Sequence, residues 1–296
     1  MNDLKKPLDA AQHPIFIMGT QRSGTTLLTR MLSAHAHIFV QNELPLIKVF
    51  VGDRSKSTII KKISEIIKRK HGSSVDELVS DKGIKCWGLK DPQLTEYIEE
   101  LKAFLPGSKF IIIVRDGRGV ANSYIENKWG LGTNAYTGAL RWKEEVQQQK
   151  AFMKLAPENF MLIRFEDLVT DMPNNLKKVC EFLNIEYSDT MLNYHKSDAA
   201  YVANKENINT QRKPDVQLAN KWQQRLTKKQ IDIIEYAAGD ELNANNYTLQ
   251  GQNITLSPIA MFYYKLHQKI VGEWQLQFQL KRAKIKGKVK QWRKQN

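Results

Sequence analysis

Two segments of the chain combine residue types that bind anionic groups. The first is Gly19-Thr-Gln-Arg-Ser-Gly-Thr-Thr26, in which two glycines five positions apart precede two hydroxyl side chains. Glycines let backbone N–H groups turn toward an anion, and the N-terminus of a following helix adds its dipole. The spacing therefore predicts a phosphate-binding turn, and we take its binding residues to be Arg22, Ser23, Gly24, Thr25 and Thr26. An arginine on the turn fits a compact oxyanion held without a metal.

The same turn differs from the Walker loop of nucleotide hydrolases. That loop carries a lysine immediately before the last hydroxyl residue, where it reaches the β- and γ-phosphates, whereas this chain has Thr25 there. The most strongly apolar strand pattern ends in Arg115 and not in an acidic residue that would hold magnesium. A P-loop kinase or NTPase is therefore a more distant alternative, which magnesium-dependent ATP turnover would favour.

The second segment places a guanidinium where open α/β sheets bind their ligands. Lys109–Val114 has a strong strand pattern and Arg115 follows it directly. Ligands of such sheets bind outside the carboxyl ends of the strands, and arginine binds a terminal phosphate through paired hydrogen bonds. Ser123 comes eight residues later, about two helical turns on and on the same side. We predict that Arg115 and Ser123 bind a second phosphate.

Strand and helix patterns alternate around these two segments. Short apolar runs predict strands at 14–18, 38–40, 84–89, 109–114 and 160–163. Helical patterns occur at 27–32, 59–70, 92–105, 120–127, 135–155, 174–183 and 217–238, and residues 195–216 have the polar composition of a long loop. This alternation predicts an α/β fold with a P-loop-type central parallel β-sheet flanked by helices.

Length and composition are those of a globular chain. It has 296 residues, 42% of them hydrophobic and 26% charged, which suffices for a sizeable core. Cys86 and Cys180 are its two cysteines, too few for a disulfide scaffold and without the partners of a zinc module. With no stretch resembling a signal peptide or a membrane span, we expect a cytoplasmic protein.

The last part of the chain is strongly basic. The formal net charge is +14, and from Lys281 to the end there are eight basic residues and no acidic one. Phe262, Leu266, Ile270 and Trp274 recur every four residues, so we divide the chain into a domain at 1–255 and a basic amphipathic helical extension at 256–296. This extension either packs on the domain with a solvated basic end or lies on an anionic membrane surface, which would make the protein peripheral at the membrane.

Together the two anion-binding segments resemble a known family. IFIMGTQRSGTTLLTRML and FIIIVRDGRGVANSYIENKWG are similar to the two cofactor signatures of sulfotransferases that use 3′-phosphoadenosine 5′-phosphosulfate (PAPS). The resemblance covers about residues 14–226, and it implies that the first signature binds the 5′-phosphosulfate and the second the 3′-phosphate. Arg212 and Lys213 fall where the family has a late basic segment that binds the cofactor.

Within this family the chain most resembles protein-tyrosine sulfotransferases and the related bacterial group. Gln41-Asn42-Glu43 resembles their GEE-type segment and Lys90-Asp91-Pro92 matches their KDP segment, which implies that Glu43 is the catalytic base and Lys90 a transition-state stabiliser. Asn127 stands where the family has a second basic residue. The expected reaction is sulfuryl transfer to an acceptor hydroxyl without a metal. The expected acceptor is a glycan or small molecule, alternatively a tyrosine peptide, and nucleic acid is not an expected partner.

Overall fold

The computed structural model describes the backbone of residues 10–196, 217 and 219–295, and side chains as far as residue 284. The chain forms two compact units that interleave along the sequence. The first comprises residues 1–115 with 148–218, and the second comprises 116–147 with 219–296. The division into 1–255 and 256–296 stays a prediction.

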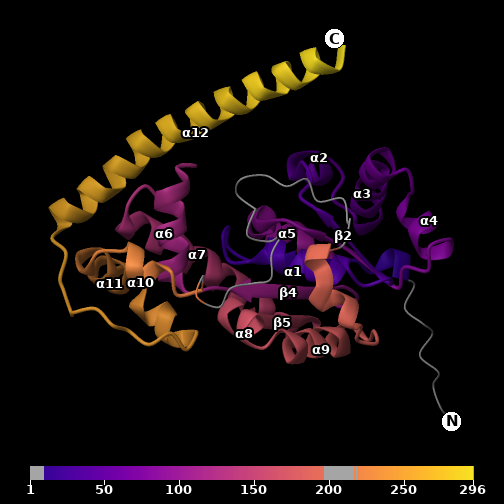
Figure 1. Cartoon of the computed structure of the whole chain (residues 1–296), viewed down its shortest axis with the longest axis horizontal. Helices are drawn as coiled ribbons and strands as arrows, with labels where there is room; N and C mark the ends of the chain where they lie inside the picture. Colours follow the sequence, from indigo (N-terminus) through magenta and orange to yellow (C-terminus); the bar gives the residue numbers. More distant parts are fainter. Residues whose placement is uncertain (1–9, 197–216, 218, 296) are drawn as a thin grey trace. The chain divides into compact units, whose positions relative to one another are not determined.

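The first unit contains a parallel sheet, of which Figure 1 labels β2, β4 and β5, and its five strands follow the order β2-β3-β1-β4-β5. The strands are β1 (Ile15–Met18), β2 (Ile38–Asn42), β3 (Cys86–Lys90), β4 (Lys109–Val114) and β5 (Phe160–Arg164). Phe16, Phe110 and Phe160 are in register on three neighbouring strands, and their rings stack with centroids 5.0 and 4.7 Å apart. Such cross-strand aromatic pairs fix the register, and the predicted parallel sheet is confirmed.

Seven α-helices of the described chain lie wholly in this first unit: α1 (Thr25–Ser33), α2 (Leu46–Phe50), α3 (Lys56–His71), α4 (Val75–Ser80), α5 (Ile98–Leu101), α8 (Phe165–Thr170) and α9 (Met172–Leu183). The single helix predicted at 92–105 is instead the short α5 between two 3₁₀ segments, Pro92–Tyr97 and Lys102–Phe104. Leu101 and Phe104 are both buried and are three residues apart, a spacing that matches the tighter 3₁₀ turn.

The second unit is helical. It contains α6 (Gly117–Asn127), α10 (Trp222–Arg225), α11 (Lys228–Ala244) and α12 (Pro258–Gln295), together with most of α7 (Ala135–Met153). The expected helical extension at the C-terminus is therefore present as α12. Across the described ranges, no helix combines the length with the apolar character that crossing a membrane would require.

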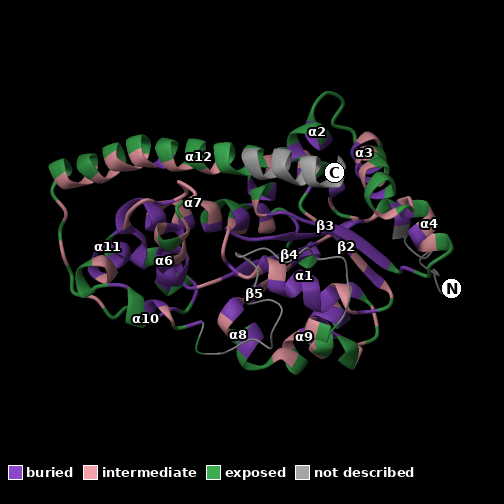
Figure 2. Ribbon diagram, turned by 45° about the horizontal axis from the view of Figure 1, so that its top comes forward, coloured by how far each residue is buried: buried purple, intermediate pink, exposed green. Residues whose placement is uncertain are grey.

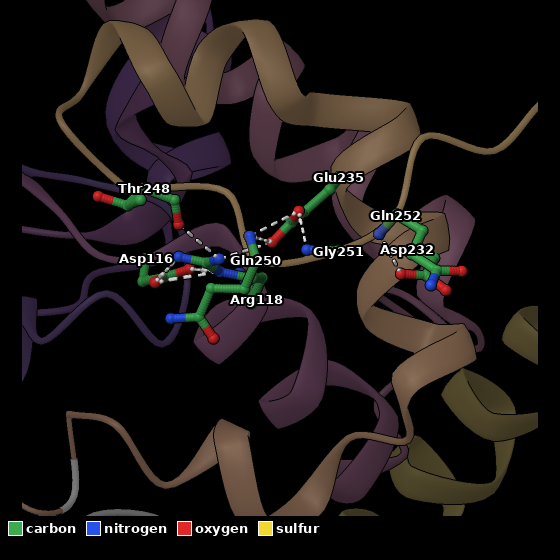
Figure 3. Close-up of polar contacts among 8 residues, drawn as sticks. All are labelled: Asp116, Arg118, Asp232, Glu235, Thr248, Gln250, Gly251 and Gln252. Carbon is green, nitrogen blue, oxygen red and sulfur yellow. Dashed lines mark hydrogen bonds and ion pairs between the residues drawn. The ribbon is translucent and has the colours of Figure 1, made fainter.

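A buried ionic cluster holds the start of α6 in this second unit (Figure 3). The Arg118 guanidinium donates to the Asp116 carboxylate at 2.8 Å and to Glu235 of α11 at 2.6 Å. The Glu235 carboxylate also accepts from the backbone N–H of Gln250 at 3.0 Å and of Gly251 at 2.7 Å. The cluster thus joins α6, α11 and the segment that follows α11, and all three charged side chains are almost fully buried.

Candidate active site

The candidate site follows the carboxyl ends of four neighbouring strands in the first unit. The turn Gly19–Gly24 comes after β1, Glu43 directly follows β2, Lys90 ends β3, and Arg115 directly follows β4. Because these strands are parallel, their carboxyl ends share one edge of the sheet, where ligands of open α/β sheets bind. The strand order therefore brings segments far apart in the sequence to one place.

Lys90 is the centre of the polar contacts at this edge. Its Nζ donates to Glu43 Oε1 at 2.7 Å and to Thr26 Oγ1 at 3.1 Å. The Lys90 side chain is 1% exposed, whereas that of Glu43 is 55% exposed. The structure thus joins three of the predicted site residues, with a buried cation between a hydroxyl of the anion-binding turn and an accessible carboxylate. A buried charge interacts more strongly with a nearby ligand than a solvated one.

The Glu43 backbone is held in an uncommon conformation. Its φ is 42°, in the left-handed region, and its N–H donates to the Lys90 carbonyl at 2.8 Å. Non-glycine residues in this region are uncommon and cluster at functional sites, where the surrounding structure imposes them. This hydrogen bond extends the β2–β3 pairing by one residue beyond the strand, which fixes the carboxylate beside Lys90.

The turn after β1 has the features of an oxyanion-binding loop. Arg22 and Gly24 have φ values of 73° and 102°, and α1 begins at Thr25 with no side-chain cap among the described residues. The first N–H groups of a helix have no intrahelical partner, so they are available to an anion. The Thr20 and Ser23 hydroxyls are also buried without a hydrogen-bond partner in the described part of the chain. Buried polar groups are normally paired, so this loop fits a bound oxyanion.

Arg115 is anchored to this turn. Its guanidinium donates to the Arg22 carbonyl at 3.2 Å and lies 4.8 Å from the centre of the Phe165 ring. Phe165 begins α8 directly after β5 and also packs against Gly24. The sequence reasoning did not select Phe165. Its one signal in the sequence was its place two residues after the strand predicted at 160–163.

Replacing Gly24 by Ala tests how closely the turn packs. A Cβ there would lie 2.3 Å from the Phe165 ring, and φ is already 102°. We expect the conformational cost of about 1–2 kcal/mol plus an overpacking cost of about 1–3 kcal/mol. Gly72→Ala is the matched control, because Gly72 has a φ of 80° but nothing within 4 Å. Urea unfolding should show a clearly larger loss for Gly24→Ala, and equal losses would contradict the packing of Phe165 on the turn.

Asp91 is a buried acid next to Lys90. Burial raises its pKa to about 6, and the nearby Glu43 acts in the same direction, while hydrogen bonds from the Gln93 and Leu44 backbone act against it. Its Oδ1 accepts from the Gln93 N–H at 2.9 Å, so the side chain also caps the following 3₁₀ turn. Asp91 is therefore a second residue at the site that sequence reasoning did not select, although it belongs to the KDP segment.

The raised pKa of Asp91 predicts a pH dependence of stability. Between its ordinary pKa of 3.8 and its folded value of about 6, the folded chain holds a proton that the unfolded chain has released. Stability is therefore lost as pH rises through this window, by about 3 kcal/mol in all. Urea unfolding at pH 4 and pH 7.5 should show Asp91→Asn gaining stability relative to the wild type at the higher pH. The exposed Glu96→Gln in the same segment is the control, and identical pH profiles for the two variants would contradict the prediction.

The roles of three other predicted residues stay predictions. Ser123 lies half-buried on α6, in the second unit, and its role beside Arg115 stays a prediction. Arg212 and Lys213 lie outside the described residues. No group of three or more potential metal-ligating His, Cys, Asp or Glu side chains occurs within the described ranges. The expectation of a reaction without a metal also stays a prediction.

A turn with the features of an oxyanion-binding loop, but without the Walker lysine, lies at the same sheet edge as a buried lysine, a carboxylate and an arginine. This arrangement is typical of group-transfer enzymes of the P-loop type. Residues 14–189, more than half of the chain, match the model of the Sulfotransferase family. The chain belongs to that family and is a sulfotransferase.

Relatives and solved structures agree with this assignment. The chain is 28% identical over 209 residues to a putative protein-tyrosine sulfotransferase of Caenorhabditis briggsae, covering 64% of this chain and 71% of the relative. It is 28% identical over 199 residues to protein-tyrosine sulfotransferase 2 of Gallus gallus, covering 62% of this chain and about half (54%) of that relative.

Two solved structures share the fold. The sulfotransferase domain of the curacin biosynthetic pathway has a TM-score of 0.57 at 22% identity, over 80% of this chain and 99% of that domain. The sulfotransferase domain of the Synechococcus PCC 7002 olefin synthase has a TM-score of 0.59 at 18% identity, over 80% of this chain and 97% of that domain. Together with the family match, they confirm the fold expected from the sequence.

Proposed function

We propose that this chain transfers a sulfuryl group from PAPS to the hydroxyl of an acceptor. The observation that carries the proposal is the contact of Lys90 with both Thr26 and Glu43. It connects the oxyanion-binding turn to a carboxylate that is accessible to an incoming hydroxyl. Within the sulfotransferase family this arrangement supports in-line transfer from a donor bound at the turn to a hydroxyl that approaches beside the carboxylate.

The residues after β1 and β4 fit the two anionic ends of this donor. The turn would bind the 5′-phosphosulfate with Arg22, the Ser23 hydroxyl and the N–H groups of Thr25 and Thr26. No side chain of the described residues caps these N–H groups, and the Ser23 hydroxyl has no hydrogen-bond partner among them. Arg115 would bind the 3′-phosphate, and Ser123, Arg212 and Lys213 stay predicted ligands of the same donor. PAPS supplies an activated sulfuryl group whose leaving group is a stabilised phosphate.

Lys90 and Glu43 divide the work of the transfer. The Lys90 ammonium, buried and next to Thr26, stabilises the negative charge that grows on the oxygens during transfer. The Glu43 carboxylate, half exposed, accepts the proton of the acceptor hydroxyl. Because Lys90 contacts both groups, it also holds the carboxylate in line with the anion-binding turn.

The acceptor we propose is the hydroxyl of a glycan or small molecule. Asn127 in place of the family's second basic residue supports it, because that residue is part of the tyrosine-acting pattern. A tyrosine-containing peptide is the second candidate. It is favoured by the names of the relatives, which are protein-tyrosine sulfotransferases.

Calorimetry with 3′,5′-bisphosphoadenosine, the donor without its sulfuryl group, tests the donor site. We expect binding that does not depend on magnesium and that Arg115→Ala weakens by at least about tenfold, as loss of a charge-assisted pair implies. Binding of magnesium ATP without binding of the bisphosphate would contradict the proposal. Transfer of labelled sulfate to phenols, oligosaccharides and acidic tyrosine peptides then separates the acceptor candidates.

A further inference from the structure

Much of helix α12 is exposed (Figure 2), and its exposed residues include many large hydrophobic side chains. Nine of the fourteen large hydrophobic side chains exposed in the described part of the chain belong to this one helix. They are Ile259, Phe262, Tyr263, Leu266, Ile270, Trp274, Leu276, Phe278 and Leu280, with exposures from 37% to 81%, and we call them the α12 stripe. Large contiguous apolar patches on a protein surface mark interaction sites.

The side of α12 away from the stripe is the one that packs on its own unit. The Gln268 side chain accepts from the Thr133 N–H at 2.8 Å, and Gln275 accepts from the Gly130 N–H at 3.2 Å. Gly272 approaches Gly130 so closely that a Cβ on Gly130 would lie 2.3 Å from the Gly272 carbonyl oxygen.

The pitch of the helix separates the stripe from these contacts. At about 100° per residue, Leu266 and Ile270 lie about 200° around the helix axis from Gln268, the residue between them. The contacts of Gln268 and Gln275 therefore fix one side of α12 to the second unit, while most of the stripe faces away from it. Leu276 and Phe278 lie at the borders of the docked side, each about 80° around the helix axis from Gln268. Internal packing explains the docked side and does not account for the stripe.

Charge identifies the kind of surface that suits the stripe. Between residues 258 and 296 there are ten Lys and Arg residues and a single acidic residue, Glu273. Lys265 and Lys269 are exposed beside the stripe, and Lys281 and Lys284 are exposed at its C-terminal end. Aromatic and aliphatic side chains bordered by basic ones are typical of helices that lie in the headgroup region of an anionic bilayer.

We propose that α12 lies along an anionic lipid bilayer, with the stripe inserted at the boundary between headgroups and acyl chains. A second copy of this chain is the competing occupant. Pairing two stripes would bring together two helices that each carry a net charge of +9, ten basic residues less one acidic. Attachment to an anionic bilayer is instead strengthened by every one of these basic residues. The proposal concerns attachment and is independent of the transfer reaction.

Co-sedimentation of the full chain with vesicles tests this attachment. We expect binding to vesicles of phosphatidylcholine mixed with phosphatidylglycerol, and little to phosphatidylcholine alone. The double variant Phe262→Ser/Trp274→Ser should bind at least about tenfold more weakly because it removes two inserted aromatic side chains. Leu155→Ser is the matched control, since Leu155 is 58% exposed but lies outside α12, and it should bind like the wild type.

Charge variants test the electrostatic half of the proposal. Lys281→Gln/Lys284→Gln should weaken binding by at least about tenfold, and Glu273→Gln should strengthen it by about fivefold. Binding that depends on these lysines but not on Phe262 and Trp274 would overturn the insertion of the stripe. Equal binding to both kinds of vesicle would overturn the preference for an anionic bilayer. A dimer in sedimentation equilibrium that dissociates in the Phe262→Ser/Trp274→Ser variant would overturn the proposal in favour of a second copy of this chain.

Discussion

Replacing Lys90 by Met is expected to lower the rate of sulfate transfer by about 10²- to 10³-fold, with little change in donor binding. Removing one preorganised donor that acts on developing charge has effects of this size in other enzymes. Lys90 is 1% exposed and contacts both Thr26 and Glu43, so water cannot easily enter and compensate for the loss of its charge. Met keeps the length of the side chain and limits the change in packing. Single-turnover transfer from labelled PAPS, with the acceptor found in the screen, measures the effect.

A second lysine provides the matched control for this experiment. Lys102 pairs with Glu99 at 2.7 Å, the same distance as the Lys90–Glu43 pair, but both of its members are exposed. Exposed pairs contribute little, so Lys102→Met should leave transfer unchanged. If Lys90→Met and Lys102→Met had equal rates while both remained folded by circular dichroism, Lys90 would have no part in the reaction. A loss confined to donor binding would assign Lys90 to binding alone.

Replacing Arg118 by Met is expected to lower the free energy of unfolding by about 3–5 kcal/mol. Such a loss follows when one member of a buried ion pair is removed and the other charges stay uncompensated. Here Asp116 and Glu235 would both remain, with side chains only 7% and 5% exposed. The Trp222 ring, whose centre lies 4.2 Å from the guanidinium carbon, would lose its cation as well.

Urea unfolding followed by far-UV circular dichroism measures this loss. Arg54→Met is the control, because Arg54 pairs with Glu100 at 2.7 Å but is itself 63% exposed, and its replacement should change stability by less than about 1 kcal/mol. Adding Asp116→Asn and Glu235→Gln to Arg118→Met should restore part of the stability, since neutral partners no longer carry uncompensated charge. If Arg118→Met, the combined variant and Arg54→Met all unfolded at the same urea concentration as the wild type, the cluster would not stabilise the second unit.

Local patterns in the sequence were enough to predict the scaffold of the site. Apolar runs and the Gly19–Thr26 segment define strands and a turn by their own residue types, because burial and backbone freedom are properties of short segments. Once the sheet is parallel, the residues that follow its strands must share one edge. That is why Arg22 and Arg115 could be selected as candidates before any contact was known, whereas Glu43 and Lys90 were selected by the resemblance of their segments to the sulfotransferase family.

Only the tertiary structure decided which side chains meet. Strand order places β3 between β2 and β1, and this neighbourhood brings Lys90 to Glu43 and to Thr26, 47 and 64 residues away in the sequence. Long-range packing likewise set Phe165 against Gly24, and no periodicity encodes that approach.

The same distinction holds for the helices. The spacing of apolar residues indicated that α12 is amphipathic, but a stripe of this kind can face either a core or solvent. The contacts of Gln268 and Gln275 determine which side of the helix is docked. The periodicity of the sequence indicates which face of a helix is apolar and which is polar. Which residues each face contacts depends on how distant segments pack.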